Sequence, residues 1–362
     1  MLHEALAYEV FRAAGIAAPR TGYAYVRVDD EDYGVYLNVE TPDRVMLPRW
    51  FESTGHLYEG NAGADVTPAR EDRFEVDEGD EEDRSDLEAL IGAAGGEGPL
   101  SARIAPVADL GQMTGEWAVE RYLGQWDGYA AADGYSPNNY YLHSDATGRF
   151  RMLPWGMDQA FDRRLPFVGR EGGVLYASCL SEAVCAAAFR ARVFALPDLV
   201  SGLALDARAE SIAALLAPWQ ALDPRREQTL AEIAAGVAST RRFIAERPGD
   251  LADGALWGEV PRSSGPDPGP PADLLAPETL ITDGPRAVVR SAGPSRRVRF
   301  TFSATEEGAR FECRLDEDAY APCSSPARER ARPGRHTFRV RAIDAAGNAD
   351  PTPGRRTWRV TR

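Results

Sequence analysis

The sequence predicts an α+β domain followed by a smaller all-β domain. Of its 362 residues, 44% are hydrophobic and 27% are charged, as in ordinary globular proteins. The charge is uneven, because residues 271–362 carry +5 and residues 1–270 carry −20 within a total of −15. The two parts meet at residues 261–271, where five of eleven residues are Pro and two are Gly, a composition that ends helices and strands. The predicted boundaries are 1–257 for the first domain, 258–276 for a semi-rigid linker and 277–362 for the second domain.

The first domain is predicted to begin with a helix and a β-hairpin. Apolar residues share one helical face ahead of a stop at Gly15; they are Leu2, Leu6, Val10 and Phe11. Residues 23–28 and 33–39 are rich in β-branched and aromatic residues, and the four acids between them indicate a hairpin turn. Residues 71–88 then hold eleven acids that do not fit the spacing of a calcium loop. We interpret them as a solvated acidic loop that leads into a helix near residues 86–91.

Helical spacing returns ahead of a second hairpin. Apolar residues recur on one face of the next predicted helix, at Leu110, Met113, Trp117 and Leu123. Residues 140–143 and 150–153 have the composition of two strands, and the turn residues 145–148 join them. Residues 186–247 are predicted to be helical. The first domain is therefore expected to carry its hairpins in front and its helices behind.

The second domain is predicted to be a small β-sandwich. Residues 298–302 and 338–342 alternate apolar with polar side chains, which is the pattern of half-buried strands. A length of about 85 residues with clusters of Gly, Pro and Asp between strands suits two packed sheets.

The four Cys residues form two close pairs in the sequence. Four Cys allow three connectivities, and local pairing of Cys179 with Cys185 and of Cys313 with Cys323 is the most economical. A metal site would favour tighter spacing or nearby His, and the chain has only four His. Disulfides persist in oxidising compartments, so we expect an extracellular or cell-surface location. The sequence opens on an amphipathic helix instead of a signal peptide, so we expect that segment to lie upstream.

Composition weakens several functional classes. No stretch reaches 18 apolar residues, so no transmembrane segment is expected. The net charge of −15 argues against a protein that binds nucleic acid. All 41 basic residues are Arg, so a Lys nucleophile or a Lys that clamps phosphate cannot come from this chain.

Four polar residues around the second predicted hairpin could carry chemistry. Asp127 precedes the hairpin, Asn138 and Asn139 open it, and Asp158 follows it. Since a tight hairpin brings its two ends together, Asn139 and Asp158 should lie side by side, and Asp127 can reach the same place. Phosphoryl transfer needs one carboxylate to orient the attacking hydroxyl and hard oxygen ligands to hold magnesium. The alternative is structural, with Asp127 and Asn138 capping a turn and Asp158 capping the next helix.

The order of these motifs resembles the CotH kinase family, which is named for a spore coat protein and is related to atypical secreted kinases. The matching stretches are residues 6–15 with 18–21, 33–36 with Glu40, 57–60, 125–127, 138–142, 150–155 and 157–161. Together they cover roughly residues 1–250. The resemblance implies a kinase-like bilobal fold, with ATP and magnesium as cofactors.

The resemblance also implies roles for particular residues. Asp127 would be the catalytic carboxylate, Asn139 and Asp158 would hold the metal, and Asn138 would support the loop. By analogy with kinases, Glu4 on the first helix would orient a cationic group that binds phosphate, and Glu40 would lie where a hinge contacts adenine. Glu4 as a surface helix residue and Glu40 as a strand-end residue are the competing interpretations.

The chain departs from the family pattern in four respects. The first N-lobe strands, which commonly precede the first helix, are missing, and so is Lys. The family often has an acid where this chain has Gly156. The loop between Asp127 and Asn138 is long, with an apparent insertion at residues 130–137.

The second domain resembles bacterial Ig-like repeats of surface proteins, on residues 311–316, 321–323 and 342–348. That resemblance implies a spacer or adhesive module with a cell-surface or matrix partner. For the whole chain we expect a protein kinase that phosphorylates Ser or Thr of a secreted or cell-envelope protein. The alternative is a non-catalytic protein of surface assembly, coat assembly or adhesion on a degenerate kinase-like scaffold.

Overall fold

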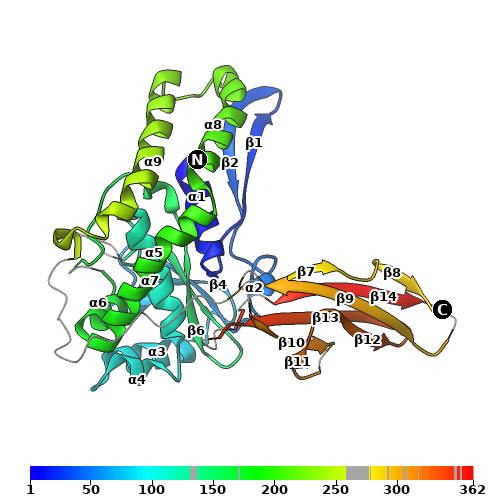
Figure 1. The fold of residues 1–362 in the computed structure, drawn as a ribbon. Helices are drawn as coiled ribbons and strands as arrows, with labels where there is room; N and C mark the ends of the chain where they lie inside the picture. The colour runs from blue at the N-terminus through cyan, green and yellow to red at the C-terminus, as the bar shows by residue number, and fades with distance from the viewer. Residues whose placement is uncertain are drawn as a thin grey trace. The chain divides into compact units, whose positions relative to one another are not determined.

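The computed structural model describes most of the chain as two compact units (Figure 1). They comprise Met1–Pro48 with Glu52–Pro271, and Arg49–Phe51 with Ala272–Arg362. The described residues are 1–130, 137–169, 172–257, 277, 279–291, 293–304, 306, 308–316, 318–345, 349–350 and 353–361. The linker predicted at 258–276 lies outside them, as does most of the insertion at 130–137.

The predicted first helix and first hairpin are confirmed. Helix α1 (Leu2–Ala13) buries one apolar face, and Gly15 follows it with a φ of +73°. Strands β1 (Thr21–Val28) and β2 (Glu31–Val39) pair antiparallel in a two-stranded sheet. Asp29 and Asp30 connect them, both with positive φ, as hairpins with two-residue turns require.

A four-stranded antiparallel sheet lies at the centre of the first unit, in the order β4–β3–β5–β6. The second predicted hairpin is confirmed as its β5–β6 half. The prediction of a loop within residues 71–88 is wrong in part, because strand β4 runs through it. Phe74 and Val76 pack toward the core while the acids between them point outward, so the acidic count masked a strand alternation. The strands are β3 (Leu57–Gly60), β4 (Phe74–Glu78), β5 (Tyr140–Ser144) and β6 (Phe150–Pro154).

Helices make up much of the rest of the described chain before residue 257. They are α2 (Leu47–Trp50), α3 (Ser85–Gly95), α4 (Leu100–Ile104), α5 (Leu110–Leu123), α6 (Val174–Ser181), α7 (Ala183–Gly202), α8 (Leu205–Leu222) and α9 (Leu230–Asp250). This confirms the predicted helices near 86–91, at 110–123 and, with breaks, across 186–247. Among the helices that the structure describes, none is both long and apolar enough to cross a membrane.

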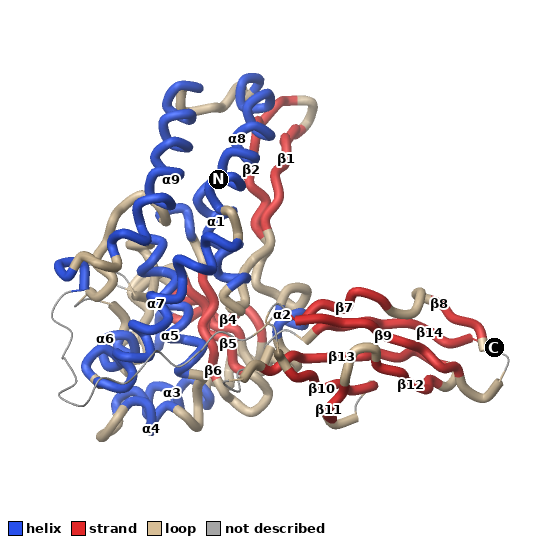
Figure 2. Tube along the Cα trace, viewed as in Figure 1, coloured by secondary structure: helices blue, strands red, loops and turns tan. Residues whose placement is uncertain are grey.

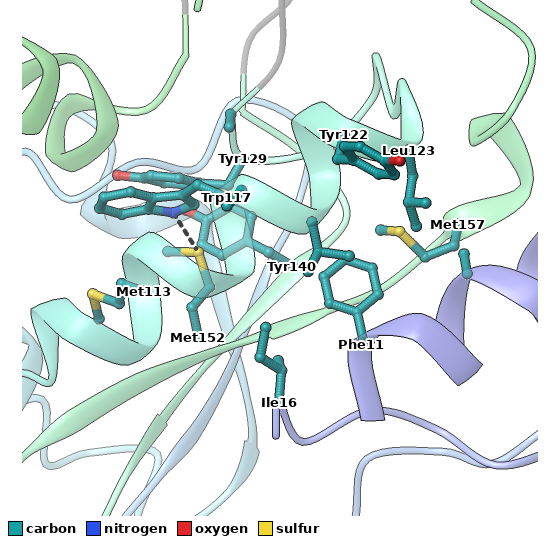
Figure 3. Packing of buried hydrophobic residues seen from close by; sticks show 14 of the residues in the cluster. Phe11, Ile16, Met113, Trp117, Tyr122, Leu123, Tyr129, Tyr140, Met152 and Met157 are labelled. Carbon is teal, nitrogen blue, oxygen red and sulfur yellow. Dashed lines mark hydrogen bonds between the residues drawn. The ribbon is translucent and has the colours of Figure 1, made fainter. Parts of the chain in front are cut away.

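Helix α5 is the centre of the core, and its ends are well specified. Asp109 caps its N-terminus by accepting a hydrogen bond from the Gln112 backbone, and Gly124 ends it with a φ of +71°. Trp117 packs within the core against Tyr129, and its indole N–H donates to the Met152 sulfur (Figure 3). The loop that leaves α5 therefore starts from a rigid base.

The described residues between 277 and 361 form an all-β region, as predicted (Figure 2). One sheet has the order β11–β10–β13–β14–β8, and the other β12–β9–β7. Phe300 of one sheet stacks on Phe338 of the other, with 3.9 Å between their ring centroids. Trp358 packs against Phe300 in the same core. The strands are β7 (Thr279–Asp283), β8 (Val288–Arg290), β9 (Arg296–Ala304), β10 (Arg310–Leu315), β11 (Ala321–Cys323), β12 (Ala327–Ala331), β13 (Gly334–Ile343) and β14 (Gly354–Thr361).

Both predicted disulfides are present. Cys179–Cys185 joins α6 to α7, and Cys313–Cys323 joins β10 to β11. The two pairs are separated by 6 and 10 residues in sequence.

Replacing Cys313 and Cys323 with Ser should destabilise the second unit by about 2–3 kcal/mol, because a loop of this length regains its entropy in the unfolded chain. Amide hydrogen exchange in β10 and β13 measures this loss. Replacing Cys179 and Cys185 is the control and should leave those strands protected. Equal protection in the wild type and the Cys313/Cys323 variant would contradict the prediction.

Candidate functional site

The structure brings Asp127 together with both asparagines that open the second hairpin. The Asn138 side-chain amide donates to Asp127 Oδ1 at 3.2 Å. The Asn139 amide donates to Asp127 Oδ2 and to its backbone oxygen, each at 2.8 Å. Asp127 is half-buried and its carboxylate accepts from two neutral donors, so the pair of amides fixes its orientation.

The turn after β6 packs directly on Asn139. The Trp155 backbone N–H donates to the Asn139 carbonyl at 3.0 Å. Gly156 has a φ of +57°, and a Cβ added there would lie 2.6 Å from Asn139 Cγ. Only Gly fits this conformation and approach without a shift. Gln125 ties the two segments together, since its amide donates to the Gly156 carbonyl at 2.9 Å.

Asp158 lies two residues beyond that contact, in a 3₁₀ turn formed by residues 157–159. Its exposed carboxylate accepts from the Gln159 amide at 2.6 Å. Its backbone oxygen lies 3.1 Å from His3 Nδ1 on α1. The alternative role for Asp158 as a helix cap is wrong, because the next helix begins after Gly173.

Glu4 faces the same turn from α1. The pKa of Glu4 is raised, mainly by burial. The N-terminal amine opposes this rise, and the Asp158 charge adds to it. Glu4 is therefore a half-buried carboxylate close enough to Asp158 to sense its charge. Its neighbour His3 has a lowered pKa, mainly because of burial, and also contacts Thr240 Oγ1 of α9 at 2.9 Å.

Glu40 has a different environment at the end of β2. Its carboxylate accepts from the Arg20 side chain at 2.9 Å and from the Arg20 backbone N–H at 3.1 Å. The Arg20 side chain is largely exposed, so this ion pair contributes little to stability. A role in nucleotide binding would require Arg20 to turn aside.

The donor set suits magnesium. Asn139 gives its N–H groups to Asp127, so its Oδ1 is the atom left for a cation. Asp158 adds an exposed carboxylate two residues beyond the Gly156 contact. Magnesium is usually held by one or two protein carboxylates together with water and substrate phosphates. Among the described residues, no group of three or more His, Cys, Asp or Glu is placed to hold a metal ion.

A groove of about 510 Å³ opens between α1, β2, α8 and α9. This volume lies in the range of small-ligand sites. His3 and Thr240 line it, and Arg225 and Arg226 of the α8–α9 loop add cations. Neither Asp127 nor Asp158 is among its described lining residues, but His3, which lines it, contacts the Asp158 backbone oxygen.

Sequence reasoning missed two buried acids under this cluster, Glu116 and Glu120 of α5. Both are fully buried, and Glu120 accepts from the backbone N–H groups of Tyr129 and Ala130. Their spacing of four residues on a helix otherwise rich in core residues was the available signal. A cation also lies beside the loop, where Arg163 stacks 4.5 Å from the Trp126 ring centroid.

Replacing Gly156 with Ala should destabilise the first unit by about 1–3 kcal/mol, because the new residue has a strained φ and collides with Asn139. Urea unfolding measures the change. Gly202→Ala is the matched control, since a Cβ there meets nothing within 4 Å. Equal stability of the two variants would show that the turn does not press on Asn139.

Comparison with protein-family models matches residues 1–250 to a family described as CotH kinase protein. Among curated proteins, the chain is similar to inner spore coat protein H of Bacillus subtilis (strain 168), with 24% identity over 178 residues. The alignment covers 45% of this chain and 47% of that protein, so the chain spans about half the length of this relative. The family match includes the segments that carry Glu4, Asp127, Asn139 and Asp158.

Proposed function

Since the chain belongs to the CotH kinase family, we propose that it transfers the γ-phosphoryl group of ATP to Ser or Thr of a secreted or cell-envelope protein. The family match and the similarity to a spore coat protein support a CotH-like kinase or coat role. The observation that carries the proposal is the contact of Asp127 with Asn138 and Asn139. It gives a carboxylate and an amide oxygen fixed positions next to each other.

In this proposal, Asp127 orients the acceptor hydroxyl by accepting its hydrogen bond, and then its proton. A bond forms between that oxygen and the γ-phosphorus while the bond to the ADP oxygen breaks. The two amides hold the carboxylate in one rotamer, which is the positioning that phosphoryl transfer depends on.

Asn139 Oδ1 and the Asp158 carboxylate are the proposed magnesium ligands, and Asn138 supports the loop. Bound magnesium would neutralise charge on the ATP phosphates. Glu4 would act on the same side, where it already senses the Asp158 charge. Glu40 would approach adenine at the end of β2. Since this chain has no Lys, a cation that it supplies at the phosphates would be an Arg; a residue upstream of this sequence, or no such cation, are the alternatives.

The experiment is magnesium-dependent transfer of labelled γ-phosphate to the chain itself and to dephosphorylated casein, a Ser-rich acceptor. We expect labelled Ser or Thr, with loss of label on chelation of magnesium and in Asn139→Ala. Gln112→Ala, at a half-buried amide near the start of α5, is a control for a general loss of packing. Failure of the chain to bind magnesium–ATP at millimolar concentration would end the proposal.

A non-catalytic role in surface or coat assembly is the second candidate. The sheet beside α1 has two strands among the described residues, and Asp223 accepts from the Val35 backbone N–H on β2 at 3.0 Å. That contact occupies an edge where a further strand would pair. Binding of magnesium–ATP without transfer of label to either acceptor would favour this candidate.

We propose a coat or cell-surface location, with the second unit as an Ig-like adhesive module. The relative's name supports the location, and the surface of the unit supports an anionic partner. Arg339 and Arg355 lie opposite each other on β13 and β14. Like charges side by side on a sheet are destabilising, so an anionic partner would relieve them. Reversing the charge of Arg339 and Arg355 should weaken binding to polyphosphate, and unchanged binding would contradict this role.

A further inference from the structure

We propose that the buried Glu116–Glu120 pair positions Asp127, with Glu120 holding the backbone just beyond Asp127 and Glu116 holding Glu120 through a shared proton. The inference rests on the proposed function, because it concerns the segment that carries the catalytic carboxylate. Neither acid contacts substrate in this account, so both are positioning residues.

The Glu120 carboxylate accepts hydrogen bonds from the backbone that follows Asp127. Its Oε1 accepts from the Tyr129 N–H at 3.0 Å, and its Oε2 accepts from the Ala130 N–H at 2.7 Å. Each carboxylate oxygen therefore holds one peptide group, two and three residues beyond Asp127. Charge-assisted bonds of this kind are stronger than bonds between neutral groups.

Gly128 provides a second, independent observation. A Cβ at this position would lie 2.1 Å from Glu120 Oε1, so any other residue would displace either the carboxylate or the loop. Gly128 directly follows Asp127 in the chain. The segment from Asp127 to Ala130 is thus fitted closely over the Glu120 carboxylate.

Glu116 lies one helical turn before Glu120 and is also fully buried. Among the described residues, neither carboxyl oxygen of Glu116 has a hydrogen-bond partner in this conformation, and the Glu120 charge acts on it. Two carboxyl groups can bond only if one of them is protonated and donates. Burial, followed by the Glu120 charge, raises the pKa of Glu116 well above its ordinary value. Burial also raises the pKa of Glu120 to about 7, against the opposing effect of its backbone donors.

Other titratable groups face the pair from the neighbouring elements. Tyr129 and Tyr140 pack beside Trp117 (Figure 3), and burial raises the pKa of both phenols well above its usual range. Asp65 accepts a hydrogen bond from the Tyr129 hydroxyl at 3.1 Å.

Two further groups lie on the helical side of the pair. Tyr176 of α6 is buried and senses the Glu120 charge. The Arg121 guanidinium of α5 donates hydrogen bonds to the Ala130 and Phe167 carbonyls, so it already has partners in the same loop. Removing the shared proton would leave two carboxylates one turn apart with Arg121 as the nearby cation. Their repulsion would loosen the Tyr129–Ala130 backbone and, with it, Asp127.

The test compares Glu116→Gln, which keeps a donor at every pH, with Glu120→Gln, which removes the carboxylate acceptor. Glu88→Gln, at an exposed position on α3, is the control. The first measurement is the protection of the Tyr129 and Ala130 amides against hydrogen exchange from pH 6 to 9, corrected for intrinsic exchange. We expect protection to fall at least tenfold in the wild type and in Glu88→Gln, and to stay constant in Glu116→Gln.

The second measurement is the pH profile of phosphoryl transfer, whose alkaline limb should move upward in Glu116→Gln. Identical pH dependence of amide protection in the wild type and Glu116→Gln would overturn the inference, whether or not Glu120→Gln folds. The exchange measurement does not depend on enzymatic activity. If the exchange results are as expected but no phosphoryl transfer is detected, the proposed function is wrong and the role of the pair still stands. If the wild type and Glu116→Gln differed in exchange but had the same pH profile of transfer, the pair would have only a structural role, and the inference would also be overturned.

Discussion

Asp127→Asn should lower magnesium-dependent phosphoryl transfer by about 10²- to 10⁴-fold, which is the usual contribution of a positioned general base. The amide is close to the carboxylate in size, and its oxygen can still accept from Asn138 or Asn139. We therefore expect the variant to fold and to bind magnesium–ATP almost as the wild type does. Transfer of labelled γ-phosphate under saturating nucleotide measures the loss.

Asp198→Asn is the matched control, because Asp198 is an exposed residue of α7. It should retain wild-type transfer. If Asp127→Asn transferred phosphate within about threefold of the wild type, Asp127 would not be the catalytic carboxylate. Equal loss in both variants would point to the preparation and not to the site.

The stability of the first unit should decrease as pH rises from about 4.3 to 7, through the Glu116–Glu120 pair. In the folded state burial raises the pKa of Glu120 to about 7, whereas an unfolded Glu ionises near pH 4.3. A raised pKa stabilises the folded state fully below the unfolded value, and that stability is lost as pH rises toward the folded value. For one retained proton the loss is about 1.4 kcal/mol per pH unit, or about 3–4 kcal/mol over this window.

Urea unfolding at pH 5, 6 and 7 measures this slope. Asp86 does not contribute in this range: burial raises its pKa, but hydrogen bonds from Ser144, Tyr58 and His56 lower it overall, so its stabilisation is lost only as pH falls below this window. The comparison of variants isolates the pair. Glu120→Gln should flatten the slope, because burial and not Glu116 raises the Glu120 pKa, while Glu88→Gln should keep it. Parallel curves for the wild type and Glu120→Gln would mean that Glu120 loses its proton below pH 5.

Much of the fold could be predicted because local signals agreed with the tertiary structure. The hairpin turns, the Gly stops at Gly15 and Gly124 and the core face of α5 are each local features. The Cys spacings were also sufficient to predict both disulfides. Strand β4 was missed because its outward positions are all acidic, so composition concealed the alternation of Phe74 and Val76.

The candidate site divides in the same way. The hairpin geometry predicted that Asn139 lies beside Asp158 and that Asp127 can reach the same place. The structure shows hydrogen bonds from Asn138 and Asn139 to Asp127, and the pairing of Asn139 with Asp158 stays a prediction. The link from Gln125 to Gly156 was not predictable, since it joins a side chain to a distant backbone carbonyl. The Glu116–Glu120 pair was missed because acids on a helix ordinarily face water, and only tertiary packing buries these two.

Gly156 shows how the structure changes the interpretation of a family departure. The sequence comparison presents it as a lost acid. In the structure, its positive φ and its contact with Asn139 make it the position where the turn passes close to the proposed metal ligand. The departure therefore has a packing consequence, which the stability of Gly156→Ala tests.

The central claim is that Asn139 and Asp158 hold one divalent cation beside Asp127. A crystal structure of the chain with manganese and a non-hydrolysable ATP analogue tests it most directly, because manganese is located by its anomalous scattering. The account predicts a peak about 2.0–2.4 Å from Asn139 Oδ1 and an Asp158 carboxylate oxygen, with the γ-phosphate on the Asp127 side. A bound nucleotide whose manganese lies away from both residues would contradict it.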